Sequence, residues 1–347
     1  MTNHHSTEKR KSEHIDIALT KQVSGRGITT GLENYRFIHQ ALPEINFNDI
    51  DISTAFLNKK MKAPLVLSSM TGGTERAWKI NLNLAAAAEK RGWAVGTGSV
   101  RAAFENPELS YTYNMRKAAP SIPIFANLGA VQLNKGYGID ECRRTVDIVQ
   151  ADALVLHLNS MQEVFQTEGD TDFSHLLEKI ENICMALGVP VGIKEVGMGI
   201  NGQLAKQLFE SGVSFVDVAG AGGTSWIQVE KFRSKDPIRI QAAEAFYDWG
   251  IPTSECIVSV REHISESKKT LIASGGLSTG VDAAKAIALG ADLAGFGRSI
   301  LRDAAESEEA LDQTLERIEM ELKIAMFGIG VKNIASLKST PLIKKIV

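Results

Sequence analysis

The sequence predicts an α/β protein folded as a (β/α)₈ barrel, the TIM barrel, with an N-terminal extension and a C-terminal helix. From about residue 64, short aliphatic runs alternate with longer stretches of helical period, which is typical of repeated βα units and a parallel sheet. Glycine and polar residues follow nearly every run, and a barrel gathers such strand ends at one mouth. A doubly wound open sheet would share much of this local pattern. We count eight runs: Leu65–Ser68, Trp93–Thr97, Ile124–Asn127, Ala153–His157, Val191–Lys194, Phe215–Val218, Leu271–Ala273 and Leu293–Phe296.

The segments between the runs have the spacing of amphipathic helices. Apolar residues recur at roughly helical intervals in Ala77–Arg91, and Val281–Leu289 also reads as a helix. After the last run, Ala304–Lys323 reads as one long charged helix. No Pro/Gly/Ser-rich linker marks either end of the barrel region, so we expect a single domain. Its parts are an N-terminal extension (1–62), the barrel (63–300) and a C-terminal helical segment (301–347).

Composition limits the class of partner. The net charge of −3 and the pI near 6.2 give no global positive field for nucleic acid or anionic lipid, so any anion must be bound locally. The N-terminus lacks the apolar stretch of a signal peptide, and the apolar runs are too short to span a membrane. Three dispersed cysteines without metal-ligand spacing fit reduced thiols. We expect a cytoplasmic protein with no membrane or nucleic-acid partner.

Two glycine clusters follow the seventh and eighth runs: Ser274-Gly275-Gly276-Leu277 and Gly295-Phe296-Gly297-Arg298. Glycine lets backbone N–H groups approach a phosphate closely, and the N-terminus of a following helix favours its negative charge. The alternative is a pair of tight turns. Because barrels commonly bind phosphate after strands seven and eight, we favour phosphate binding.

Lys194 ends an otherwise apolar strand, where a buried lysine needs a partner. It could form a salt bridge with Glu195 or another carboxylate at the barrel mouth. Equally, it could be a fixed cation beside a flavin ring edge, stabilising the negative charge of the reduced cofactor. The sequence leaves these two interpretations open.

Polar residues are dense in the segment 157–163, which suggests a substrate-facing loop. His157 and Asn159 lie on the same side of an extended chain and are followed by Gln162 and Glu163. Singly, His157 could be a hydrogen-bonded core histidine and Glu163 a charge at a helix N-terminus. Glu163 could also hold Mg²⁺ if substrate phosphates and water complete the oxygen shell.

The pair Arg10-Lys11 lies in a mixed-charge stretch near the N-terminus. From its spacing alone, the default interpretation is a solvated helix face.

Together, an ordered set of motifs over most of the chain resembles the type 2 isopentenyl-diphosphate isomerases. The resemblance is carried by Arg10-Lys11 with His14-Ile15, Met70-Thr71-Gly72-Gly73, Gly98-Ser99, Ala126-Asn127-Leu128-Gly129, His157-Leu158-Asn159 with Gln162-Glu163, Lys194-Glu195-Val196-Gly197, Gly222-Gly223-Thr224 and Ser274-Gly275-Gly276.

This resemblance implies a barrel enzyme that interconverts isopentenyl and dimethylallyl diphosphates without net redox change. It implies FMN, active in its reduced form, together with Mg²⁺, NADPH as the reductant of FMN, and a homo-oligomer, either a tetramer or an octamer. The FMN contacts would be Met70, Thr71, Gly72, Ser99, Asn127, Lys194, Thr224, Gly275, Gly276, Leu277, Ala294 and Gly295. The diphosphate substrate would contact Arg10, Lys11, Arg101, His157, Asn159 and Gln162, and Glu163 would hold Mg²⁺. Arg10-Lys11 thereby becomes a candidate diphosphate clamp.

Moving a double bond by one carbon requires protonation of the alkene at one end and removal of a proton two carbons away. Developing positive charge needs a protected pocket and an electron-rich surface, which a reduced flavin face can provide. We place Gln162, His157 and Glu230 in the catalytic group. Gln162 is a neutral amide and so positions groups, while proton transfer falls chiefly to the flavin. Trp226, with Glu230, resembles the family pattern and would line the alkene end; packing and surface charge are their alternative roles.

Two rival functions remain. Another FMN barrel enzyme, such as a 2-hydroxy-acid oxidase, would use the same phosphate-binding glycines, although the His-Gly-Gly-Arg arrangement of that family is not evident here. A non-catalytic FMN-binding protein would be yellow but would turn over no diphosphate.

Overall fold

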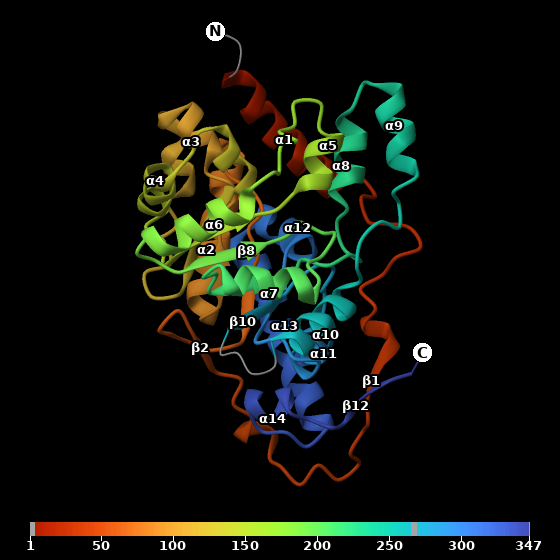
Figure 1. Ribbon diagram of the computed structural model, residues 1–347. Helices are drawn as coiled ribbons and strands as arrows, with labels where there is room; N and C mark the ends of the chain where they lie inside the picture. Colours follow the sequence, from red (N-terminus) through yellow and green to blue (C-terminus); the bar gives the residue numbers. More distant parts are fainter. Residues whose placement is uncertain (1–3, 265–268, 347) are drawn as a thin grey trace.

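The computed structural model describes residues 4–264 and 269–346, and a closed barrel of eight parallel strands forms its centre (Figure 1). The strands pair in the order β10-β11-β4-β5-β6-β7-β8-β9, so each predicted aliphatic run supplies one strand and the barrel prediction is confirmed. Their bounds are β4 Leu65–Leu67, β5 Ala94–Gly96, β6 Ile124–Gly129, β7 Ala153–His157, β8 Val191–Lys194, β9 Phe215–Asp217, β10 Thr270–Ala273 and β11 Leu293–Phe296.

Strand register brings polar residues from distant parts of the chain to the same level. Gly129 pairs with His157, His157 with Lys194, and Lys194 with Asp217 across four neighbouring strands. These residues lie at the carboxyl ends of their strands, where a barrel opens. The register therefore builds a polar floor for the mouth.

Aromatic residues fill the opposite, N-terminal end of the barrel. A hairpin of β2 (Thr54–Phe56) and β3 (Lys59–Met61) places the Phe56 ring with its centroid 5.2 Å from that of Phe215 and 5.7 Å from that of Phe125. Gly192 is required here, because a Cβ at this position would lie 2.1 Å from the Phe215 ring. This packed plug leaves the other end of the barrel for ligands.

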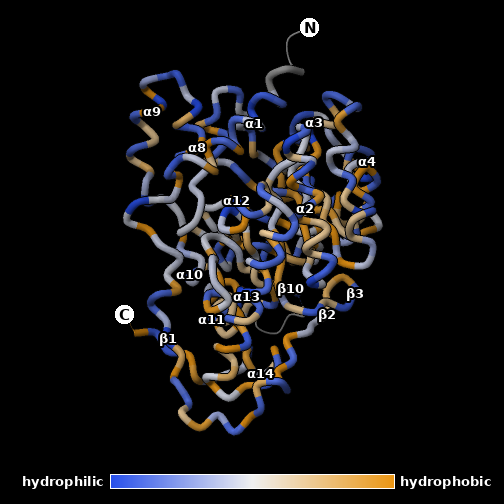
Figure 2. Tube along the Cα trace, turned by 180° about the vertical axis from the view of Figure 1, so that it is seen from behind, coloured by the Kyte–Doolittle hydropathy of each residue, from blue (hydrophilic) through white to orange (hydrophobic). Residues whose placement is uncertain are grey.

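Helices surround the barrel and contribute buried apolar residues to its core, and hydrophobic stretches of the trace, coloured orange in Figure 2, gather in the interior of the molecule. Thr74 caps α2 (Glu75–Arg91) by accepting a hydrogen bond from the Ala77 N–H. The remaining outer helices are α4 (Ile139–Val149), α6 (Leu176–Ala186), α7 (Gly202–Glu210), α10 (Thr253–His263), α11 (Gly280–Ala288) and α12 (Arg298–Glu306). Shorter elements extend the strand ends at the mouth: α3 (Arg101–Glu105), α5 (Ser160–Phe165), α8 (Trp226–Arg233) and α9 (Pro237–Glu244).

The C-terminal region corrects one sequence expectation. The prediction of a single helix over Ala304–Lys323 was wrong, because α12 ends at Glu306 and a second helix, α13, spans Glu308–Gly328. Ser307 is extended and its side chain accepts a hydrogen bond from the Ala310 N–H, so it ends one helix and caps the next. The expected division of the chain at residue 300 falls inside α12.

The two ends of the chain extend the barrel in different directions. Helix α1 (His4–Thr20) lies at the barrel mouth near α8, whereas β1 (Tyr35–Phe37) pairs with β12 (Ile343–Lys345) beside α14 (Ile334–Lys338), far from the mouth (Figure 1). No helix within residues 4–264 or 269–346 combines the length and the apolar character that a membrane span needs.

Candidate active site

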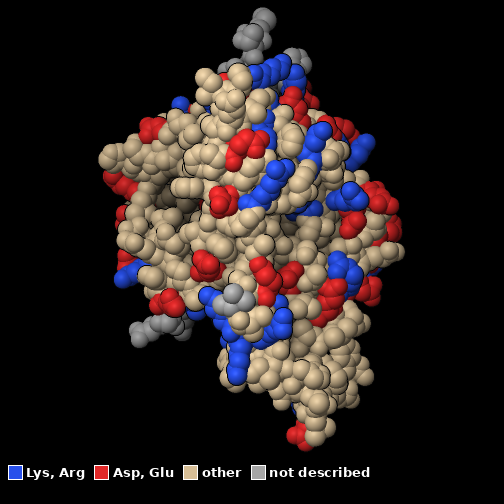
Figure 3. Space-filling view, turned by 90° about the vertical axis from the view of Figure 1, so that its right-hand side faces the viewer, with Lys and Arg blue, Asp and Glu red and all other residues tan. Residues whose placement is uncertain are grey.

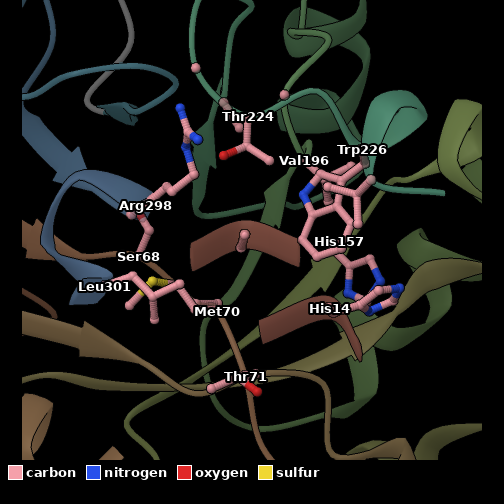
Figure 4. A pocket seen from close by; sticks show the side chains of 18 of the residues that line it. His14, Ser68, Met70, Thr71, His157, Val196, Thr224, Trp226, Arg298 and Leu301 are labelled. Carbon is pink, nitrogen blue, oxygen red and sulfur yellow. The ribbon is translucent and has the colours of Figure 1, made fainter. Parts of the chain in front are cut away.

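A cavity of about 680 Å³ lies where the carboxyl ends of the barrel strands meet. Its walls come from the strand-end loops, from α1 of the N-terminal extension, and from α8 and α12. In Figure 4, Arg298, Met70 and Leu301 lie on one side of the cavity, and Trp226, Val196 and His14 lie on the other. Segments far apart in the sequence thus share one space.

Most of the predicted site residues line this cavity, and four do not. Gly72 packs under Tyr113, where a Cβ would lie 2.2 Å from the ring. Ala294 and Gly295 are buried within β11, and Glu230 is 1% exposed behind the wall. Those that line it are Arg10, Lys11, Met70, Thr71, Ser99, Arg101, Asn127, His157, Asn159, Gln162, Glu163, Lys194, Thr224, Trp226, Gly275, Gly276 and Leu277.

The glycines after β9 and β10 pack backbone against backbone. Gly275 and Gly276 have φ of +105° and +83°, conformations that L side chains rarely adopt. A Cβ at Gly223 would lie 2.5 Å from the Gly276 backbone nitrogen, and a Cβ at Gly275 would lie 2.1 Å from the Gly220 carbonyl oxygen. The cluster therefore forms tight turns that line the cavity, and phosphate binding at these turns stays a prediction.

Lys194 presents a buried cation to the cavity. Its Nζ donates to the Glu195 carbonyl oxygen at 2.6 Å, while the Glu195 carboxylate accepts from backbone N–H groups of its own loop, at 2.6 Å for Gly197. Burial lowers the pKa of Lys194, against the opposing charge of Asp217. In the described chain no salt bridge joins Lys194 to Glu195, and Lys194 is among the residues that line the cavity.

His157 is a neutral imidazole. Burial, followed by the positive charges of Lys194 and Lys11, lowers the pKa of His157 to about 3. Its Nδ1 lies 2.9 Å from Asn127 Oδ1, and because an amide oxygen only accepts, Nδ1 carries the proton. Nε2 is then an acceptor, and His157 at neutral pH cannot supply a proton from an imidazolium.

Arg10 and Lys11 reach into the cavity from α1, and so the solvated-face interpretation was wrong. The Arg10 side chain is only 11% exposed. Lys11 Nζ donates to the Ser99 carbonyl oxygen at 2.7 Å and to Tyr113 Oη at 2.8 Å. Burial and the Arg10 charge lower the pKa of Lys11 to about 7. Two cations held this close together, with Arg101 nearby, favour an anionic ligand.

Glu163 is a buried carboxylate beside these cations. Its Oε1 accepts from Asn159 Nδ2 at 2.8 Å and its Oε2 from the Asp170 N–H at 2.7 Å. Burial raises the pKa of Glu163. Within the described residues no group of three or more His, Cys, Asp or Glu side chains could hold a metal ion, so Glu163 offers a single carboxylate ligand.

Glu230 holds two cavity-lining side chains from behind. Its Oε1 accepts from His14 Nε2 at 2.9 Å and from Gln162 Nε2 at 3.1 Å. Burial opposes its ionisation, but the hydrogen bond and charge of His14 and the charge of Arg233 together keep the pKa of Glu230 below its ordinary value. The His14 ring stands edge-on to Trp226, with centroids 5.0 Å apart (Figure 4).

Comparison with known proteins decides the family. A family model described as FMN-dependent dehydrogenase matches residues 134–344. The chain is 54% identical to an isopentenyl-diphosphate delta-isomerase of Oceanobacillus iheyensis over 96% of the chain and 95% of that relative. It is 50% identical to one of Nostoc sp. over 96% and 94%, respectively. The chain belongs to the isopentenyl-diphosphate delta-isomerase family. The family predicted from the ordered motifs is thus confirmed.

Two of the solved structures with a similar fold are those of a lactate oxidase and a mandelate oxidase. The chain superposes on a lactate oxidase of Pediococcus acidilactici with a TM-score of 0.68 over 100% of this chain and 95% of that one, at 16% identity. A mandelate oxidase gives 0.66 over 100% of both chains, at 17% identity. At this identity the likeness shows the barrel fold alone, which this isopentenyl-diphosphate isomerase family member shares.

Sequence reasoning missed three lining residues of this family member, Ser24, Ser68 and Ser299, and it placed Gly297 and Arg298 in a phosphate-binding cluster without making them FMN contacts. Arg298 Nη2 donates to Ser24 Oγ at 2.6 Å, and Ser299 Oγ donates to the Leu277 carbonyl oxygen at 2.9 Å. Arg298 has no carboxylate partner in the described chain. The cluster Gly295-Phe296-Gly297-Arg298 was the available signal, but its cavity-facing part begins one residue after β11 ends.

Proposed function

We propose that the protein interconverts isopentenyl and dimethylallyl diphosphates with reduced FMN bound at the barrel mouth. The observation that carries this proposal is one cavity with two cationic ends built from different elements. One end has Arg298 beside the glycine turns after β10, and the other has Arg10, Lys11 and Arg101 from α1 and α3. A flavin phosphate and a substrate diphosphate are two anions that this division suits.

The residues at the first end fit FMN. Ser68 Oγ is buried without a hydrogen-bond partner in the described chain, and a Cβ at Gly297 would meet open space. Backbone at glycine turns and the N-terminus of α12 suit a phosphate, and Arg298 would pair with it. Met70, Thr71, Ser99 and Asn127 would contact the ring system, with Lys194 as the cation at its edge. When bound, reduced FMN supplies an electron-rich face and an exchangeable proton beside the alkene.

The chain's own residues hold the substrate and exclude water. The diphosphate would be bound by Arg10, Lys11 and Arg101. The alkene end would lie between the flavin face and the wall formed by Trp226 and His14. Gln162, fixed by Glu230, would orient this end, and neutral His157, whose Nδ1 is held by Asn127, would offer Nε2 to the ligand as a hydrogen-bond acceptor.

Glu163 would hold Mg²⁺ as its single carboxylate ligand, with substrate phosphate oxygens and water completing the shell. The anionic diphosphate would thereby be fixed beside Arg10. Asn159, whose Oδ1 is buried without a partner in the described chain, also faces this end.

We extend the proposal to the setting of the enzyme: NADPH reduces the FMN, the protein acts in the cytoplasm, and it assembles as a tetramer or octamer. Acidic and basic side chains are interspersed on the face shown in Figure 3, in keeping with a small-molecule substrate rather than nucleic acid.

The test is anaerobic incubation of the photoreduced holoprotein with isopentenyl diphosphate and Mg²⁺, with products separated by chromatography. Formation of dimethylallyl diphosphate supports the proposal. Reduction of the oxidised flavin by lactate or mandelate, without diphosphate turnover, would favour an oxidase instead. A yellow protein with neither activity would be a non-catalytic flavin carrier.

A further inference from the structure

Arg233, at the C-terminal end of α8, connects three elements around the cavity without lining it. Its Nη1 donates to Glu230 Oε2 at 2.5 Å, its Nε to Glu13 Oε2 on α1 at 3.1 Å, and its Nη2 to Glu168 Oε1 at 2.8 Å. Each guanidinium nitrogen thus has its own carboxylate, and the side chain is only 12% exposed.

Each carboxylate leads to a residue that lines the cavity. Glu230 binds Gln162 and His14. Glu168 also lies 3.7 Å from Arg10 Nη1, and Glu13 belongs to the same helix as Arg10, one turn further on. A single guanidinium therefore fixes both the residues at the alkene end and the helix that carries the diphosphate cations.

We propose that Arg233 is a positioning residue for the isomerisation, which aligns Gln162 through Glu230 and aligns Arg10 through Glu13 and Glu168. The inference rests on the proposed function. Arg233 itself would contact no ligand and would act only through these carboxylates.

The charges around Glu230 predict how the loss of Arg233 would change the pKa of Glu230. His14 and Arg10 face it from α1, the neutral Gln162 faces it from α5, and Arg233 is the cation in direct contact. Without Arg233 the hydrogen bond and charge of His14 would remain, but the pKa of Glu230 would rise, because a desolvated carboxylate loses a positive charge in direct contact with it. A neutral Glu230 would accept more weakly from Gln162.

The experiment compares wild type with Arg233→Gln, Arg233→Lys and Glu13→Gln in the holoprotein, measuring kcat and KM for isopentenyl diphosphate from pH 5 to 9. Arg76→Gln is the matched control, because Arg76 also forms an ion pair with α1, at Asp16, but on the surface and two residues from His14, on another face of the helix. Flavin absorbance and thermal melting report folding of each variant.

We expect Arg233→Gln to lower kcat/KM about 10- to 100-fold, as for a displaced group at a reacting centre. The acid limb, which is the fall of kcat at low pH, should move upward by about one pH unit. Arg233→Lys should restore that limb in part, since lysine keeps the charge but not the three-pronged geometry. Glu13→Gln should raise KM and leave the limb unchanged, and Arg76→Gln should change neither.

A folded, flavin-bound Arg233→Gln with wild-type kcat, KM and acid limb would overturn the inference, as would an equal effect of Arg76→Gln. An inactive wild type would refute the proposed function itself, and the inference with it. These results are distinguishable because the wild type is measured first.

Discussion

Replacement of both Arg10 and Lys11 by alanine tests the division of anions within the cavity. A charge-assisted hydrogen bond contributes about 1.5–3 kcal/mol, so the loss of two cations costs about 3–6 kcal/mol of diphosphate binding. Lys11 already donates to the Ser99 carbonyl and to Tyr113, bonds that it must weaken to bind a ligand, so the lower end applies. At about 1.4 kcal/mol per factor of ten, we expect substrate affinity to fall about 10²-fold.

The assay is the KM for isopentenyl diphosphate, with FMN affinity measured separately by flavin fluorescence. FMN should remain bound, because its phosphate is assigned to the other end of the cavity. Lys9→Ala is the control, since the Lys9 side chain is 77% exposed on the same helix. Unchanged substrate affinity in the double variant would refute the assignment, and so would an equal loss of FMN.

The remaining predictions concern the same cavity. Because the pKa of Lys11 is lowered to about 7, its side chain is a charged ammonium below that pH and a neutral amine above it. The KM for the diphosphate should therefore rise from pH 6 to 8, and the Lys11→Met variant should lose this pH dependence. A wild-type KM that does not change with pH would contradict the prediction. Glu163→Gln should raise the Mg²⁺ concentration needed for half-maximal activity about tenfold or more, measured by Mg²⁺ titration, and an unaltered titration would exclude Glu163 as ligand. Gly276→Ala should lower FMN affinity and the melting temperature together, because φ is +83° and the new Cβ would lie 2.6 Å from Thr30 Cγ2; a normal flavin titration would show that the turn tolerates a side chain.

The sequence was sufficient for the barrel because each strand is a short aliphatic run whose residues are buried on both faces. It also predicted which strand ends carry chemistry, since register and the closure of a barrel place His157 and Lys194 side by side. The helix break at Ser307 could have been found as well, because a serine followed by two glutamates is a helix start signal.

The features of the site that could not be predicted from local sequence depend on tertiary contacts. The charge pattern around Arg10 and Lys11 is the same for a solvated helix and for one packed over a cavity, and only the fold distinguishes them. Likewise, Glu230 was expected at the alkene end, whereas the structure places it behind Gln162, held by Arg233. Contacts across more than 60 residues of sequence leave no periodic signal.

The central claim is that reduced flavin and a diphosphate alkene share this cavity without net redox change. Its most direct test is to incubate the photoreduced holoprotein anaerobically in D₂O with isopentenyl diphosphate and follow both the product by NMR and the flavin by its absorbance. The account predicts dimethylallyl diphosphate carrying deuterium while the flavin stays reduced at the end of turnover. Absence of that product, or one equivalent of flavin oxidised per diphosphate consumed, would contradict it.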